Sequence, residues 1–201
     1  MSAVEPPNHH ANFPGFSGWF GVVAGLSMVK RNGIARRAAD LTGITASDKV
    51  IDVGCGPGTA VREAARRGAT ATGIDPAPVM LRIARLTTLP STRIRWRKGA
   101  AEALPLPDGS ANVLWSISTV HHWPDLEGGL SECFRVLEPG GRFLAIERRR
   151  KPGSTGMASH GWTDEQAQGF ADMCMAAGFS APEVRIETIG EQHHLIVLAA
   201  R

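Results

Sequence analysis

Strand-like and helix-like segments alternate along the middle of this chain, and the joins between them are short. Runs rich in β-branched and other apolar residues predict strands over 49–53, 70–74, 94–98, 111–117 and 142–147. Helical composition predicts helices over 34–41, 59–67, 77–86 and 126–136. This alternation predicts an α/β fold, an open, doubly wound and mostly parallel sheet with helices on both faces.

The last forty residues are expected to add antiparallel strands to this sheet. A long helix is expected over Thr163–Ala177, started by an N-cap threonine and ended by Gly178. Two further strand-like runs, Val184–Ile189 and Leu195–Ala199, are separated by Gly190–Gln192 and predict a hairpin. The complete sheet is therefore expected to have seven strands in a Rossmann-like arrangement, with an antiparallel C-terminal hairpin.

Ligands of such sheets bind at the carboxyl ends of the strands. The site is therefore expected at the turns that follow Val53, Ile74, Lys98, Ile117 and Glu147. The region 46–201 would form this ligand-binding domain. Segment 1–45 is expected to be a lid or cap, because Phe13, Phe16, Trp19 and Phe20 lie among glycines before the first strand. The alternative is that these aromatic residues simply cover the sheet.

Composition limits the remaining possibilities. The chain has 201 residues, 43% of them hydrophobic, which suits one ordinary domain with a full core. Its 22 Lys and Arg stand against 19 Asp and Glu, a balance that gives no argument for nucleic acid. Three dispersed cysteines (Cys55, Cys133, Cys174) predict neither disulfides nor a metal site and favour the cytoplasm. No apolar run is long enough to span a membrane, and the oligomeric state, a homodimer included, stays open.

A glycine-rich turn follows the first predicted strand, in the segment VIDVGCGPGTAV. Gly54, Gly56 and Gly58 would allow a sharp turn and a close approach of a ligand to the backbone. Their G-x-G-x-G spacing differs from the G-x-G-x-x-G of dinucleotide-binding folds. Asp52 lies two residues before the first glycine, where it would repel a pyrophosphate and attract a cationic group. The turn therefore favours a nucleoside that carries a cation.

A second acidic residue ends the next predicted strand. Asp75 lies 23 residues after Asp52, in the segment TGIDPAP, where it could accept both hydroxyls of a ribose. The alternative role is a helix N-cap, because the following Pro76 suits the first turn of a helix. Both roles are compatible with the sequence.

These segments together resemble class I S-adenosylmethionine-dependent methyltransferases, of the small-molecule type related to the ubiquinone and menaquinone biosynthesis enzymes. The resemblance covers about half of the chain and rests on VIDVGCGPG, GIDPAP, GAAEALPLPDGSANVLWS, VHHWPD and LSECFRVLEPGGRFLAIE, in this order. It implies S-adenosyl-L-methionine as cofactor. By position, Asp52 and the turn 54–58, Cys55 included, would surround its methionine end and ribose. Asp75 would hold the ribose, Pro76, Ala101 and Glu102 would border the adenine, and Ser116 would lie under the methionine portion.

One position departs from the family pattern. The family usually has an aspartate that accepts a hydrogen bond from the adenine amino group, where this chain has Ala100. Adenine recognition is then expected to depend on backbone groups near Ala101 and Glu102 or on another side chain. The loss of one hydrogen bond costs about 1 kcal/mol, so cofactor binding should be weakened and not abolished.

Two neighbouring histidines follow the fourth predicted strand. His121 or His122 could serve as a general base if the methyl acceptor is a hydroxyl; the alternative is that they only hydrogen-bond the loop. The basic run 148–151 is interpreted as a solvated loop, or as a carboxylate site if its side chains point inward, and His160 as incidental. The expected activity is methyl transfer to oxygen of a small, partly apolar acceptor. The alternatives are a nicotinamide-dependent oxidoreductase and a non-catalytic S-adenosylmethionine-binding protein.

Overall fold

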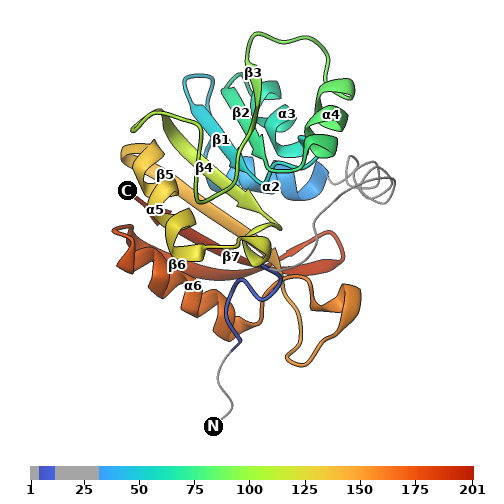
Figure 1. The fold of residues 1–201 in the computed structure, drawn as a ribbon, viewed down its shortest axis with the longest axis vertical. Coiled ribbons are helices and arrows are strands. Elements are labelled where there is room, and N and C mark those ends of the chain that lie inside the picture. Colours follow the sequence, from blue (N-terminus) through green and yellow to red (C-terminus); the bar gives the residue numbers. More distant parts are fainter. Residues whose placement is uncertain (1–4, 12–31) are drawn as a thin grey trace.

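A computed structural model describes residues 5–11 and 32–201, which form one seven-stranded sheet with helices on both faces (Figure 1). The predicted aromatic lid residues Phe13, Phe16, Trp19 and Phe20 lie outside the described residues. The strands are β1 (Lys49–Val53), β2 (Thr70–Asp75), β3 (Ile94–Lys98), β4 (Ala111–Ile117), β5 (Leu137–Arg148), β6 (Ser180–Ile189) and β7 (Gln192–Ala200).

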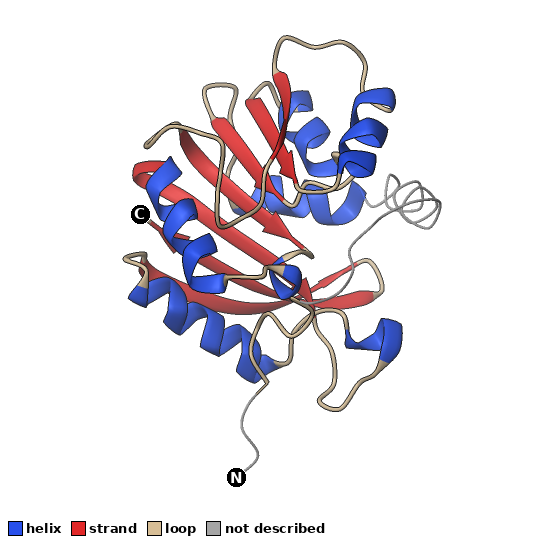
Figure 2. Cartoon of the chain, in the orientation of Figure 1, coloured by secondary structure: helices blue, strands red, loops and turns tan. Residues whose placement is uncertain are grey.

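The strand order is β3-β2-β1-β4-β5-β7-β6. Strands β1 to β5 are parallel to one another, whereas β7 is antiparallel to β5 and to β6. From β1 the strands that follow in sequence, β2 and β3, lie on one side, and β4 and β5 lie on the other. The strand order therefore reverses at β1, and ligands of such sheets usually bind in the crevice at this point. The predicted fold and its antiparallel hairpin are confirmed (Figure 2).

Two layers of helices cover the sheet. The longer helices are α2 (Asn32–Leu41), α3 (Thr59–Arg66), α4 (Pro78–Leu86), α5 (Leu126–Val136) and α6 (Asp164–Ala176). Buried side chains of α2, α3 and α4 pack with one face of the sheet, and those of α5 and α6 with the other. The alternation of strand side chains explains both layers, since Val50 contributes to the first core and its neighbour Ile51 to the second. No described helix is long and apolar enough to cross a membrane.

Several boundaries differ from those expected. Strand β5 begins at Leu137 and not at residue 142, because Leu137 pairs with Ala111 before a register shift in β4. Helix α4 begins at Pro78, so Pro76 precedes the helix. Thr163 caps α6 as predicted, and the residue that completes the capping box is Gln166. Strand β6 begins at Ser180, four residues before the predicted start.

Helix α2 belongs to the packed core although it lies within segment 1–45. Its alanines, Ala35, Ala38 and Ala39, are fully buried and join the core that also contains residues of α3. Arg37 of the same helix forms an ion pair with Glu187 of β6, with an N–O distance of 2.5 Å. Among the described residues of this segment, 5–11 lie near the carboxyl edge of the sheet, where His10 bonds to His121.

Candidate functional site

The glycine turn joins β1 to α3 at the carboxyl edge of the sheet. Gly54, Gly56 and Gly58 have φ angles of 73°, 51° and 81°, which residues other than glycine rarely adopt. The backbone N–H groups of Gly54 and Cys55 donate to the carbonyl of Ile74 at 2.8 and 3.0 Å. These bonds hold the turn against the end of β2.

The three glycines face different surroundings. A Cβ at Gly54 would lie 2.1 Å from Oγ1 of Thr119, and a Cβ at Gly58 would lie 2.2 Å from the ring of Trp96. A Cβ at Gly56 would meet nothing within 4 Å. The three positions therefore need glycine for different reasons. Gly54 and Gly58 make room for Thr119 and Trp96, whereas a side chain at Gly56 would meet open space.

Asp52 lies buried at the end of β1. Burial raises the pKa of its carboxyl group to about 7, and the nearby Asp75 adds to the rise. A buried carboxylate with this pKa is stabilised by a cationic group, because the cation favours the ionised form. This environment agrees with the predicted role of Asp52 beside a ligand that carries a positive charge.

Asp75 connects the two turns of the site. Its Oδ2 accepts a hydrogen bond from the backbone N–H of Gly56, and its Oδ1 accepts one from Ala77, both at 2.8 Å. Burial raises the pKa of this carboxyl group, and these two bonds oppose the rise. Each carboxylate oxygen has a second lone pair, so Asp75 can support the turn and still accept ribose hydroxyls. The helix-cap alternative is wrong in detail, since the side chain does not cap α4; Pro76 itself is exposed.

The side chain of Cys55 points away from the open side of the turn. Its thiol is buried, with a pKa raised well above its ordinary value by that burial and by the nearby Asp52 and Asp75. A Cβ at Gly73 would lie 2.8 Å from this sulfur, so the thiol packs over β2.

The loop between β3 and β4 carries the predicted adenine border. Ala101 is buried in the core with Trp123, and Ala100 forms an isolated β-bridge with Ala103. Glu102 is half-buried, and its Oε2 is buried with no hydrogen-bond partner among the described residues. This carboxylate is a second possible acceptor near the position where the family aspartate is replaced by Ala100.

Ser116 lies in the middle of the site edge, on β4. Its side chain is fully buried, and its Oγ accepts and donates no hydrogen bond within the described part of the chain. Buried hydroxyl groups are nearly always hydrogen-bonded. An unsatisfied one at this position, next to the glycine turn in the sheet, agrees with the predicted contact to a polar ligand.

The two predicted histidines have different environments. His121 is buried, and its Nδ1 lies 2.8 Å from Oε2 of Glu147, a fully buried carboxylate at the end of β5. A carboxylate only accepts hydrogen bonds, so Nδ1 carries the hydrogen and Nε2 keeps its lone pair. Sequence reasoning missed Glu147, although a lone acidic residue after the apolar run FLAI was a signal that could have indicated it.

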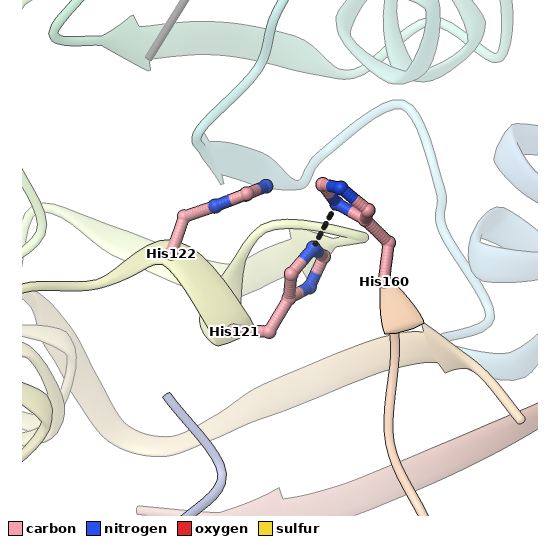
Figure 3. Close-up of side chains that lie close together, drawn as sticks. All are labelled: His121, His122 and His160. Carbon is pink, nitrogen blue, oxygen red and sulfur yellow. Dashed lines mark hydrogen bonds between the residues drawn. The ribbon is translucent and has the colours of Figure 1, made fainter. Parts of the chain in front are cut away.

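His160 joins these residues from the loop before α6. Its Nδ1 lies 3.3 Å from Nε2 of His121, and the rings of His121, His122 and His160 gather at one point (Figure 3). Burial, with the neighbouring histidines, lowers the pKa of His122 to about 3 and that of His160 to about 4. The interpretation of His160 as incidental is therefore corrected, because the fold brings it into contact with a candidate base.

Residues 5–11 lie across this histidine cluster. The backbone N–H of His10 donates to the carbonyl of His121 at 2.9 Å, and the ring of His10 lies 3.1 Å from Oγ of Ser159. The indole N–H of Trp162 donates to the carbonyl of Pro7 at 2.9 Å. The segment thus connects the loop after β4 with the loop before α6.

The basic run after β5 has partners on the protein. Arg148 donates to the carbonyls of Met157 and His160, and Arg149 pairs with Asp164. Arg150 is buried and pairs with Glu5. A cavity of about 560 Å³ beside this run is lined by Asp164 as well as by the basic residues. Arg150 does point inward, but its contact with Glu5 gives no support for a carboxylate-binding site.

Comparisons with known proteins agree with this geometry. Residues 51–145 match the family model described as a methyltransferase domain. The chain is 39% identical over 112 residues to a demethylmenaquinone methyltransferase of Tropheryma whipplei, which covers 56% of this chain and 46% of that protein. It is 37% identical over 110 residues to a ubiquinone biosynthesis O-methyltransferase of Pseudomonas fluorescens, covering 53% and 47%. The chain thus spans about half the length of these relatives.

A solved structure shows the same fold over nearly the whole chain. It is a SAM-dependent methyltransferase from Aquifex aeolicus, with a TM-score of 0.73, 17% identity, and coverage of 89% of this chain and 97% of that one. The strand order and this likeness define the class: the chain has the Rossmann-like fold of S-adenosylmethionine-dependent methyltransferases. More narrowly, residues 51–145 match the methyltransferase-domain model, which confirms the resemblance predicted from the motifs.

Proposed function

We propose that this protein transfers a methyl group from S-adenosyl-L-methionine to a hydroxyl oxygen of a small, partly apolar acceptor. The observation that carries the choice of oxygen is the pair formed by His121 and Glu147 at the carboxyl ends of β4 and β5. An imidazole oriented by a carboxylate is a typical general base. A neutral hydroxyl needs such a base, since its proton must leave as the new bond forms.

The residues of the glycine turn fit the proposed cofactor. Gly56 leaves an open cradle, Asp52 offers a buried carboxylate for a cationic group, and Ser116 offers an unsatisfied hydroxyl. Asp75 would accept the ribose hydroxyls, and Glu102 with the backbone of Ala101 would border the adenine. When bound, the cofactor supplies a methyl group on a sulfonium sulfur, which leaves as a neutral thioether.

The two histidines would have different roles. His121 would take the hydroxyl proton on Nε2, since its Nδ1–H is held by Glu147, and the carboxylate would stabilise the imidazolium that forms. His122 has a pKa of about 3, caused first by burial, and so it is a poor proton acceptor at neutral pH. Of the two predicted candidates, the geometry therefore supports His121, with His122 placed beside the acceptor.

The relatives support the acceptor class. They are named as a demethylmenaquinone methyltransferase and a ubiquinone biosynthesis O-methyltransferase, which supports a quinone-like, partly apolar acceptor. One relative is named as an O-methyltransferase, which agrees with a base at the acceptor position. We propose an aromatic hydroxyl compound without a requirement for a negative charge, because Arg149 and Arg150 are paired with carboxylates.

Two measurements test this function. Calorimetry should detect binding of S-adenosylmethionine and no binding of nicotinamide dinucleotides; the reverse result would support the oxidoreductase alternative. Labelled cofactor should then be incubated with a panel of phenols and hydroquinones. Transfer that is lost in Glu147→Gln and kept in the exposed control Glu191→Gln supports the dyad. Cofactor binding without transfer to any phenol would favour a non-catalytic binding protein and contradict the proposal.

A further inference from the structure

We propose that His121, His122 and His160 form a binding site for a divalent transition-metal cation of the zinc class. One nitrogen from each ring lies within 4.8 Å of the other two, and Figure 3 shows the three rings converging from two loops. The cysteine pattern of the sequence predicts no metal, and the spacing of these histidines matches no zinc motif. Only the fold brings the third ligand to the other two.

The distances suit a tetrahedral cation. Zinc binds histidine nitrogen at about 2.0–2.1 Å, so two ligands of a tetrahedral ion lie about 3.3–3.4 Å apart. The measured distance between Nε2 of His121 and Nδ1 of His160 is 3.3 Å. A small rotation of the His122 ring would bring the third nitrogen from its present distance of at most 4.8 Å to the same separation.

Glu147 gives the site the support that histidine ligands of metals usually have. Such ligands almost always donate their other N–H to a carboxylate or carbonyl, which orients the ring. Oε2 of Glu147 holds Nδ1 of His121 at 2.8 Å, so the lone pair of Nε2 is directed to the other two rings. Oε1 of the same carboxylate is buried and has no hydrogen-bond partner among the described residues. The buried negative charge would offset part of the charge of a cation.

The donor set selects the kind of cation. Three imidazoles without a direct carboxylate ligand favour zinc, copper, nickel or cobalt over magnesium and calcium, which prefer oxygen. In the absence of a cation His160 must donate its Nδ1–H to His121, so metal binding requires His160 to move its hydrogen to Nε2. Three protein ligands leave a fourth position open, as in catalytic zinc sites.

A cation at this site would compete with the proposed chemistry, and this consequence rests on the proposed function, whereas the site itself does not. Nε2 of His121 can hold a metal ion or accept a hydroxyl proton, but not both. A bound cation would therefore remove the proton acceptor, and methyl transfer should fall as the site fills. The apparent affinity of zinc as an inhibitor should equal its affinity in direct binding.

The test begins with the full chain after treatment with a chelator. Cobalt(II) is titrated first, because a tetrahedral cobalt–imidazole site gives strong visible absorption bands, and zinc is then used to displace it. We expect one equivalent of cobalt and loss of the bands on addition of zinc. His160→Gln and His122→Gln should each weaken binding at least tenfold, whereas the exposed His193→Gln on β7 should leave it unchanged.

A further variant and a separate titration complete the design. Glu147→Gln should weaken metal binding by about 10–100-fold and keep the stoichiometry. Absence of tetrahedral cobalt bands, or equal binding in wild type and in His160→Gln, would overturn the site. Calorimetry with S-adenosylmethionine on the metal-free protein separates the two proposals. Cofactor binding without a metal site contradicts only this inference, and a metal site without cofactor binding contradicts only the proposed function.

Discussion

The two halves of the site are built in different ways. The half formed by the turns after β1 and β2 depends on backbone groups, and its residues 52–58 and 73–77 lie close together in the sequence. The half formed by the histidines depends on side chains from three separated segments, 5–11, 120–122 and 147–162. A local motif can predict the first half, but only the packing of the chain assembles the second.

The largest expected effect is a difference between alanine substitutions at two glycines of the same turn, one of which should affect stability and the other cofactor binding. Gly58→Ala should lower the free energy of unfolding by about 2–4 kcal/mol, from overpacking against Trp96 and from the left-handed backbone. Gly56→Ala has only the backbone cost of about 1–2 kcal/mol, but should weaken cofactor binding at least tenfold. Urea denaturation and calorimetry measure the two effects. If Gly56→Ala binds the cofactor normally, the open cradle is not the cofactor site.

The second prediction concerns the histidine half. Glu147→Gln should lower methyl transfer by about 100-fold or more, because general bases contribute 10²–10⁴ in rate. Cofactor affinity should stay within about twofold, since Glu147 is assigned to the other half of the site. The pH profile of the rate distinguishes a positioning role from general damage to the fold. A variant with unchanged rate would show that His121 does not depend on the carboxylate.

Substitutions of Asp75 test whether the half of the site formed by the turns after β1 and β2 also binds the cofactor through side chains. Asp75→Ala should weaken cofactor binding by about 1.5–3 kcal/mol, because it removes charged acceptors of ribose hydroxyls and two bonds to the backbone. Asp75→Asn keeps one acceptor oxygen and should lose about half of that amount. Calorimetry gives both values, and thermal unfolding reports the loss of the backbone bonds. Equal cofactor affinities of all three proteins would leave Asp75 with a purely structural role.

The smallest effect is a pH dependence from Asp52. Its pKa of about 7 in the folded chain is above the ordinary value of 3.8, because of burial and the nearby Asp75. Below pH 7 the cationic cofactor would have to displace a proton, so the dissociation constant should rise up to about tenfold per pH unit between pH 7 and 5.5. Asp52→Asn should bind more weakly at pH 7 and lose this dependence. A wild-type affinity that is flat across this range would contradict the role of Asp52.

The raised pKa of Asp52 affects folding stability in the opposite direction to cofactor binding: binding should strengthen as the pH rises, whereas stability should fall. Between about pH 4 and 7 the folded chain holds a proton on Asp52 that the unfolded chain has released. Stability should therefore fall as the pH rises through this window, and Asp52→Asn should remove that part of the fall. Thermal unfolding of both proteins without cofactor provides the control for the binding measurement.

Most of the fold could be predicted because its signals are local. Strands β1, β3 and β4 were predicted with the observed boundaries. The buried parallel strands β1 and β4 appear as short apolar runs, whereas the edge strand β3 alternates apolar and basic residues. The start of β5 at Leu137 was missed because its first residues, LEPGG, have no strand character. Their pairing depends on distant residues, since Leu137 pairs with Ala111 and the two glycines bond to Arg201. The roles of Gly54 and Gly58 were also missed, since their neighbours Thr119 and Trp96 lie far away in the sequence.

The sequence by itself therefore determined the sheet, the glycine turn and the acidic residues that end β1 and β2. These features depend on backbone conformation and on polarity within a few residues. Only the tertiary structure decided which glycine is open, which histidine has a carboxylate partner and that His160 joins them. The physical reason is that side-chain contacts between distant segments depend on how the loops after β4 and β5 pack, and no periodicity in the sequence records that packing.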